Sequence, residues 1–301
     1  MQADELKEVL HGPIAFIPTY FSRSGSQDLD SAARTVDRAI DNGMRILLLT
    51  SGDSNYGQQS EEEIRLMAAT VLGRAGDRAA VIVGTGHPWW KEQITDFGRY
   101  VESLGAAAVM VLRPQAASSD SAASEEEVFE LYREVSEALE CATVLHGRFS
   151  MPLLKRLAAL PGVGAAKEDA GDAWCHDALW AVGDHLPIFN GGQKWRFLYG
   201  ALFGMPAFMT LFGLWQPEVT HRFWDLVQQR DLYGAARVVD QFDNPYFEFA
   251  VGHARGYYAV QQAAMEVFGC GPRWLRQPQV SLDDGEMEAL RNLFERMDFP
   301  H

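Results

Sequence analysis

Short apolar segments alternate with longer amphipathic segments along most of the chain. Eight of the apolar segments have the length of buried strands and end at turn or polar residues. They are Ile14–Pro18, Arg45–Thr50, Ala80–Gly84, Ala107–Leu112, Ala142–His146, Val163–Lys167, Pro187–Asn190 and Ala207–Phe212. Strands that are separated by helices in this way pair in parallel. Since eight such units close a barrel, the pattern predicts an α/β fold, a (β/α)8 TIM barrel.

Several of the intervening helices carry clear start and stop signals. Leu29–Asn42 follows an aspartate suited to an N-cap and ends at a glycine. Ser60 and Ser124 each precede three glutamates, which is the pattern of a capping box. These boxes predict helices that reach about Leu72 and Leu139.

The pattern also predicts how the chain is organised. We expect residues 1–230 to form the barrel and residues 231–301 to form a C-terminal helical extension that ends with Asp283–Met297. No linker-like composition separates the two parts, so the extension should pack on the barrel as one structural unit. The chain has 301 residues, and a barrel commonly fills ~250 residues as one domain.

Composition narrows the class of partner and cofactor. A net charge of −15 disfavours nucleic acids and acidic membranes as partners. The three cysteines form no CxxC pair, and no P-loop, HExxH or dinucleotide-binding motif occurs, so we expect neither a metal nor a nucleotide cofactor. The N-terminal segment is not a signal peptide, and no apolar run approaches the ~20 residues of a membrane span. We therefore expect a soluble cytoplasmic protein.

One lysine differs from the other four in its surroundings. In the run Gly162–Asp169, with the sequence GVGAAKED, Lys167 closes an apolar segment, and Glu168 and Asp169 follow it. Burial disfavours the charged form of lysine, and a neutral amine can attack a ketone to form a Schiff base. The alternative is a strand-end lysine that pairs with a neighbouring carboxylate, and this segment alone favours neither.

Several segments of the chain resemble segments of the dihydrodipicolinate synthase/N-acetylneuraminate lyase family of class I aldolases and dehydratases, and they occur in the same order as in that family. The segment LPGVGAAKEDAGD is similar to the family's Schiff-base lysine strand. The segments GPIAFIPTYFSRSGSQDL, NGMRILLLTSGDSNYGQQSEEE, VIVGTGHPWW and GPRWLRQPQVSLDDGE resemble other parts of the family sequence. The resemblance covers nearly the whole chain.

This resemblance implies an aldolase- or dehydratase-type lyase that acts on a 2-oxo acid, such as pyruvate or a deoxy-keto sugar acid. Lys167 would condense with the ketone, and the iminium would act as an electron sink while a nearby carbon–carbon or carbon–oxygen bond breaks or forms. By position, the substrate-binding residues would be Thr19, Ser51, Gly52, Gly191 and Met209.

The segment after the second strand departs from the family pattern. Most members have Gly-Thr-Thr-Gly-Glu there, whereas this chain has Ser51, Gly52, Asp53, Ser54 and Asn55. An ionised Asp53 would repel a substrate carboxylate. It is expected either to act as a catalytic acid/base or to cap the loop by accepting backbone N–H bonds.

A second departure from the family pattern lies at the end of the fifth strand. Together with the altered segment after the second strand, it argues against dihydrodipicolinate synthase activity itself. His146 takes the place of the family's tyrosine and would shuttle protons, although a strand-end histidine is also a common structural group. Arg148 lies near the family's carboxylate-binding arginine in a segment that is shorter here. Gln115 and Ala116 replace a tyrosine that reaches the neighbouring subunit, so each site should be complete within one chain.

The aromatic content suggests subunit contacts. The chain contains eight Trp and seventeen Phe residues, which is a large number of aromatic side chains for one barrel to bury. Some of them are expected in subunit contacts, because aromatic residues are enriched in interfaces. With the resemblance, this implies a homo-oligomer, either a tetramer or a dimer. Trp89 and Trp90 would form an apolar wall of the active site or would be buried between helices.

The leading hypothesis is a Schiff-base lyase with Lys167, His146 and Asp53 as catalytic residues. Two alternatives stay open. The first is a catalytically altered family member that acts as a binding protein. The second is an acid/base enzyme that uses Asp53 and His146 without a Schiff base.

Overall fold

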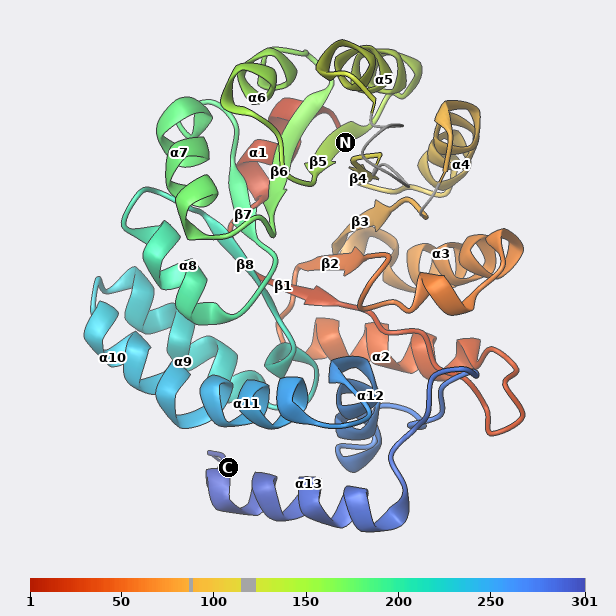
Figure 1. Cartoon of the computed structure of the whole chain (residues 1–301), viewed down its shortest axis with the longest axis vertical. Helices are drawn as coiled ribbons and strands as arrows, with labels where there is room; N and C mark the ends of the chain where they lie inside the picture. The colour runs from red at the N-terminus through yellow and green to blue at the C-terminus, as the bar shows by residue number, and fades with distance from the viewer. Residues whose placement is uncertain (87–88, 115–122, 301) are drawn as a thin grey trace.

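Eight parallel strands close into a barrel that helices surround (Figure 1). The computed structural model describes residues 1–86, 89–114 and 123–300. Neighbouring strands pair in chain order, and the last strand returns to pair with the first. The (β/α)8 TIM barrel expected from the sequence is therefore confirmed.

Each strand agrees with a predicted strand to within two residues at either end. The strands are β1 Gly12–Phe16, β2 Ile46–Leu49, β3 Ala80–Gly84, β4 Ala108–Leu112, β5 Ala142–His146, β6 Val163–Glu168, β7 Ile188–Asn190 and β8 Ala207–Thr210. Every residue of β2, β5, β6, β7 and β8 is buried. This explains their continuous apolar sequences, because a parallel sheet in a barrel is covered on both faces.

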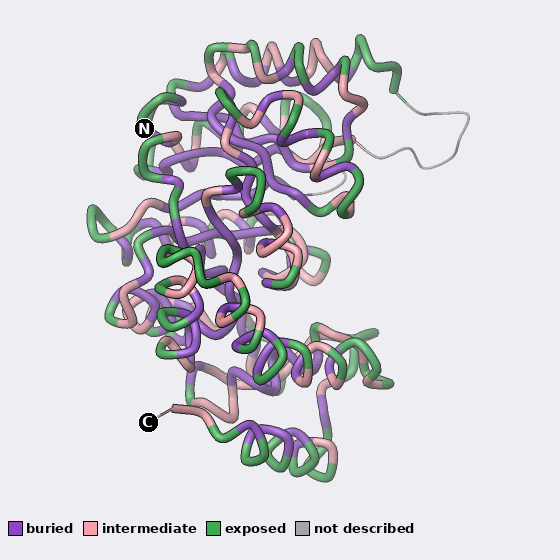
Figure 2. The backbone as a smooth tube through the Cα atoms, turned by 90° about the vertical axis from the view of Figure 1, so that its left-hand side faces the viewer, coloured by how far each residue is buried: buried purple, intermediate pink, exposed green. Residues whose placement is uncertain are grey.

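Helices surround the barrel, and exposed residues lie mainly at the periphery of the molecule while its interior is buried (Figure 2). The helices are α1 Ala3–Val9, α2 Leu29–Asp41, α3 Glu61–Ala75, α4 Lys91–Ser103, α5 Glu125–Ala138, α6 Met151–Ala158, α7 Asp172–Val182, α8 Lys194–Ala201 and α9 Pro217–Gln228. The expected caps are present: Asp28 accepts a bond from the Ser31 N–H, and Ser60 and Ser124 each begin a capping box. None of the helices in the described ranges is long and apolar enough to cross a membrane.

Further helices follow the barrel in the C-terminal part of the chain. They are α10 Leu232–Val238, the π-helical segment η5 Val239–Asp243, α11 Asn244–Gly252, α12 Tyr257–Val267 and α13 Asp284–Met297. Helix α10 packs against α8 and α9, and α12 packs against both α11 and α13 (Figure 1). These contacts place the C-terminal helices beside the barrel rather than apart from it.

A buried ion pair joins this C-terminal part to the barrel helices. Nζ of Lys194, at the start of α8, donates to both carboxylate oxygens of Asp243 in η5, at 2.8 and 2.9 Å. Each of the two side chains is 2% exposed. Burial lowers the pKa of Lys194 and raises the pKa of Asp243, and their mutual attraction opposes both shifts. The pair therefore depends on both partners, since either charge alone would be buried without compensation.

This dependence predicts a stability defect that a second substitution repairs. Lys194→Met should lower the free energy of unfolding by about 3–5 kcal/mol, because it leaves a buried carboxylate unpaired. The double variant Lys194→Met, Asp243→Leu removes both charges and should recover most of that loss. Urea denaturation of the three proteins checks this. A single variant as stable as the wild type would contradict it.

Candidate active site

A cavity of about 720 Å³ opens at the carboxyl ends of the barrel strands. The ends of β1, β4, β5, β6 and β8 line it, together with the loops after β2 and β7 and side chains from α11 and α12. Barrel enzymes carry out their chemistry at this face. The cavity is therefore the candidate active site.

Lys167 reaches this cavity from the end of β6. Its register partners in the neighbouring strands are His146 of β5 and Phe189 of β7. The lysine is only 4% exposed. A lysine amine buried to this extent needs a partner for its charge.

Asp169 is that partner. Nζ of Lys167 donates to Oδ2 of Asp169, and Nε2 of His146 lies 2.7 Å from the same oxygen. Nζ and Nε2 are 3.4 Å apart. The two nitrogen atoms therefore converge on one carboxylate oxygen. Lys167 pairs with a neighbouring carboxylate, as one sequence interpretation proposed, and it does so inside the cavity.

Burial and charge shift the pKa of two members of this cluster. Burial raises the pKa of Asp169, but the positive charge of Lys167 and the contacts with His146 outweigh it and hold that pKa well below its ordinary value. Burial, and then the charge of Lys167, lower the pKa of His146. Near neutral pH the cluster therefore contains an ionised Asp169 and a neutral His146. The Nε2 atom of His146 must then carry the hydrogen that faces the carboxylate.

Asp53 lines the same cavity from the loop after β2. Burial raises the pKa of Asp53 to about 6; the charge of Lys167 opposes this shift, and the charge of Asp169 adds to it. In the described part of the chain, no other residue donates a hydrogen bond to its carboxylate, whereas its backbone carbonyl accepts one from Gln261. Its carboxylate accepts a hydrogen bond from its own backbone N–H, so the loop-capping role that the sequence left open for Asp53 stays open beside the acid/base role.

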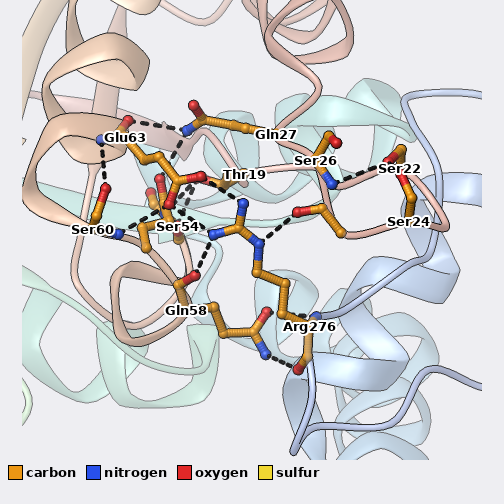
Figure 3. Close-up of polar contacts among 12 residues, drawn as sticks. Thr19, Ser22, Ser24, Ser26, Gln27, Ser54, Gln58, Ser60, Glu63 and Arg276 are labelled. Carbon is orange, nitrogen blue, oxygen red and sulfur yellow. Dashed lines mark hydrogen bonds and ion pairs between the residues drawn. The ribbon is translucent and has the colours of Figure 1, made fainter.

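Thr19 does not line the cavity, in contrast to its expected role in substrate binding. Its side chain is fully buried, and its hydroxyl donates to the Ser54 carbonyl at 2.7 Å (Figure 3). The Ser54 hydroxyl donates in turn to the carbonyl of Ile17, also at 2.7 Å. Thr19 therefore holds the loop that carries Asp53.

Arg276 fixes the same loop region from the C-terminal part of the chain (Figure 3). Its guanidinium donates to both carboxylate oxygens of Glu63 and to the carbonyls of Gly25 and Gln58, at 2.5–2.7 Å. Glu63 is also the third residue in the capping box of α3. The segment GPRWLRQPQVSLDDGE therefore ties the loops after β1 and β2 to the C-terminal helices.

The other residues expected to bind substrate line the cavity: Ser51, Gly52, Gly191 and Met209. The structure gives a steric reason for glycine at position 191. A Cβ atom there would overlap Oδ1 of Asp169 and lie 2.7 Å from Nζ of Lys167. A larger residue would therefore displace the Lys167–Asp169 pair.

One side of the cavity is aromatic, which no pattern in the sequence predicted. Phe247 of α11 and Tyr257 and Tyr258 of α12 line it, and the rings of Phe247 and Tyr257 stack with centroids 5.8 Å apart. No local motif marks these residues, because their position depends on how the C-terminal helices pack. Trp89 packs edge-on against a phenylalanine of α4, in line with burial between helices, whereas Trp90 is exposed, and neither is part of the cavity lining.

Arg148 also lines the cavity, from the loop after β5. Its side chain is exposed, so its guanidinium is available to a ligand. Arginine suits carboxylate recognition because it can donate two parallel hydrogen bonds. Arg148 is the candidate partner for a substrate carboxylate.

Two remaining expectations concern metals and the neighbouring subunit. Within residues 1–86, 89–114 and 123–300, no group of three or more His, Cys, Asp or Glu side chains is arranged to hold a metal ion. Gln115 and Ala116, which replace the family's interface tyrosine, lie outside the described residues.

The pKa of Asp53 predicts a pH-dependent effect of neutralising it. Between about pH 4 and pH 6 the folded protein keeps a proton on Asp53 that the unfolded chain has lost, so this residue's contribution to stability falls as pH rises. Asp53→Asn removes that loss. Its melting temperature relative to wild type should therefore be higher at pH 7 than at pH 4. Asp225→Asn, at an exposed aspartate of α9, is the control, and its melting temperature relative to wild type should be the same at both pH values. If the melting temperature of Asp53→Asn relative to wild type is also the same at pH 4 and pH 7, the raised pKa of Asp53 is contradicted.

Known proteins match both the sequence and the fold. Residues 9–297 match the dihydrodipicolinate synthetase family. "Probable 5-dehydro-4-deoxyglucarate dehydratase 1" of Streptomyces coelicolor is 24% identical over 299 residues, which cover 95% of this chain and 92% of that protein. A 4-hydroxy-tetrahydrodipicolinate synthase of Corynebacterium diphtheriae is 27% identical over 283 residues, or 91% and 90% of the two chains. The structure of dihydrodipicolinate synthase from Bacillus clausii superimposes with a TM-score of 0.85 at 20% identity, over 96% of this chain and 98% of that one. The chain belongs to the dihydrodipicolinate synthetase family.

Proposed function

We propose that this protein is a lyase of the aldolase or dehydratase type that acts on a 2-oxo acid through a Schiff base on Lys167. The observation that carries the proposal is the position of the Lys167 amine. It is buried at the end of β6, faces a cavity of about 720 Å³, and contacts an acid and a histidine. A buried amine with a base beside it is the arrangement that an amine nucleophile needs.

In this mechanism the amine attacks the carbonyl carbon of the 2-oxo acid, and the carbonyl oxygen leaves as water. The resulting iminium withdraws electrons from the adjacent carbon, C3. A C3–C4 bond can then break, as in an aldolase. Alternatively, C3 loses a proton and C4 then loses a hydroxyl group, as in a dehydratase. The iminium lowers the barrier of either step because it accepts the electron pair.

His146 and Asp53 are the proposed acid/base groups for these later steps. His146 is neutral near pH 7, and its hydrogen bond to Asp169 orients the ring. Asp53 has a pKa of about 6, so it can be protonated or ionised close to neutral pH. When it is protonated, Asp53 no longer repels the carboxylate of a 2-oxo acid.

The rest of the cavity supports a small organic acid as the ligand. Arg148 is proposed to hold the carboxylate, and Ser51 and Gly52 also line the cavity, from the loop after β2. Met209 and the aromatic side chains of α11 and α12 offer apolar surface to the carbon chain. The relatives named as dehydratases and synthases support a lyase, and pyruvate and deoxy-keto sugar acids are the proposed substrate classes.

This proposal accounts for more of the site than the two alternatives from the sequence. A binding protein has no need of a buried amine in contact with both an acid and a histidine. An acid/base enzyme that used only Asp53 and His146 would leave the Lys167–Asp169 pair, and the glycine that makes room for it, without a role.

We also propose a cytoplasmic homo-oligomer, either a tetramer or a dimer. Large apolar side chains are exposed on adjacent barrel helices: Trp180 of α7 is 84% exposed, and Leu202, at the end of α8, is 64% exposed. Helices α7 and α8 pack against each other. Exposed apolar side chains on neighbouring elements are typical of subunit contacts.

Trapping with borohydride tests the Schiff base directly. Incubation with pyruvate or a longer 2-oxo acid, followed by reduction, should add the mass of the ligand to the peptide that contains Lys167. Lys167→Ala should abolish the adduct and lower turnover by several orders of magnitude, because no other group supplies the electron sink. Lys155→Ala, at an exposed lysine on α6, is the matched control and should keep both the adduct and the wild-type turnover. Turnover retained in Lys167→Ala would exclude the mechanism.

Light scattering tests the assembly. The expected mass is that of two or four chains of 33.5 kDa. Trp180→Glu places a charge on the exposed face of α7 and should shift the population toward smaller species if that face is an interface. A wild-type protein with the mass of one chain would refute the oligomer.

A further inference from the structure

The contacts of the Lys167 amine raise the question of which group moves its protons. A protonated amine carries three hydrogens and a protonated Schiff base carries one, so two protons must leave the nitrogen. The carbonyl oxygen of the substrate must gain two protons to depart as water. The reaction therefore needs a base that reaches both the nitrogen and the oxygen.

We infer that Asp169 is the catalytic base of Schiff-base formation and carries both protons from Lys167 to the substrate oxygen. The inference rests on the proposed function, because it concerns a step of that reaction. It adds a catalytic residue that the sequence analysis did not assign, and it separates the roles of Asp169 and His146.

The step balances without any other reactant. Asp169 accepts one proton from the ammonium of Lys167, and the free amine attacks the carbonyl carbon. A C–N bond forms, the π-bond of the carbonyl breaks, and the oxygen takes the proton from Asp169. Asp169 then accepts a second proton from the nitrogen and gives it to the same oxygen. The C–O bond breaks, water leaves, and the nitrogen lone pair forms the iminium.

Geometry favours Asp169 over His146 for this role. Nζ of Lys167 donates to Oδ2 of Asp169, whereas Nε2 of His146 lies 3.4 Å away and directs its hydrogen at the same Oδ2 atom. A nitrogen that already carries a hydrogen has no lone pair for a second one. His146 therefore orients the carboxylate in this step, and its own proton transfers belong to later steps.

Exposure also favours Asp169. The Lys167 side chain is 4% exposed and the Asp169 side chain is 36% exposed. Asp169 thus spans the distance from the buried amine to the open cavity, where the substrate oxygen would lie. Asp53 lines the cavity as well, but it has no hydrogen bond to Nζ among the described contacts. The absence of a side chain at Gly191 leaves room for this arrangement.

A simple counter-ion would behave in the opposite way when removed. If Asp169 served only to neutralise the ammonium, the loss of its charge would favour the neutral amine, and Schiff-base formation near pH 7 would be unchanged or faster. If Asp169 carries protons, the same substitution slows the step. The two roles therefore differ in the sign of one measured rate.

The experiment measures how fast the adduct forms. Wild-type protein and Asp169→Asn are mixed with saturating pyruvate at pH 7, quenched with borohydride at increasing times, and analysed by intact mass. The 2-oxo acid that gives the strongest wild-type adduct replaces pyruvate if another is better. Asp169→Asn should form the same adduct at least about 100-fold more slowly, the usual scale of general base catalysis. Asp177→Asn, an exposed aspartate on α7, is the charge-matched control and should keep the wild-type rate.

A second variant guards against a purely structural effect. In Asp169→Ala, added formate can occupy the vacated space and supply a carboxylate, so the rate should rise with formate concentration. No rise with formate, or an Asp169→Asn rate equal to or above that of wild type, would overturn the inference and leave the Schiff base on Lys167 intact. The absence of a wild-type adduct with any of the 2-oxo acids would instead refute the proposed function itself.

Discussion

The site depends on one constraint: the Lys167 amine must be buried and must still have a partner for its charge. The Lys167 side chain is only 4% exposed, so an unpaired ammonium there would destabilise the fold. Asp169 meets this requirement two residues later in the chain, where β6 has ended and the backbone has turned toward the cavity. His146, beside Lys167 in register on β5, adds a hydrogen bond that holds the same carboxylate oxygen. The pairing that stabilises the folded site is also the one proposed to take part in the chemistry.

The surrounding structure keeps this pair in place. Gly191 leaves the space that the Lys167–Asp169 contact occupies. The loop that carries Asp53 is held by Thr19, which lies in the segment after β1, and Arg276 ties the same region to the C-terminal helices. Those helices also supply the aromatic side of the cavity. Residues far apart in the sequence therefore determine one pocket, and the C-terminal helices belong to the site rather than to its periphery.

The fold could be predicted from the sequence because its signals are local: apolar strand segments, capping boxes and terminal glycines all act within a few residues. The positions of Lys167 and His146 followed from the same logic, since parallel strands bring their carboxyl ends to one face. The direction of the Thr19 hydroxyl, which faces the loop after β2, could not be predicted, because a hydroxyl after a strand can face either the cavity or a neighbouring loop and only packing decides between them. Phe247, Tyr257 and Tyr258 were missed because no local pattern shows where α11 and α12 dock. Asp169 was visible only as a neighbouring carboxylate, and its contact with His146 required the three-dimensional register.

The central claim is that the Lys167 amine bonds covalently to the carbonyl carbon of a 2-oxo acid. A crystal structure of the protein soaked with pyruvate tests this most directly. The account predicts continuous density from Nζ of Lys167 to the second carbon of the ligand, with the ligand carboxylate directed toward Arg148 and the loop after β2. Pyruvate bound in the cavity without a bond to Nζ, or bound away from Lys167, would contradict it.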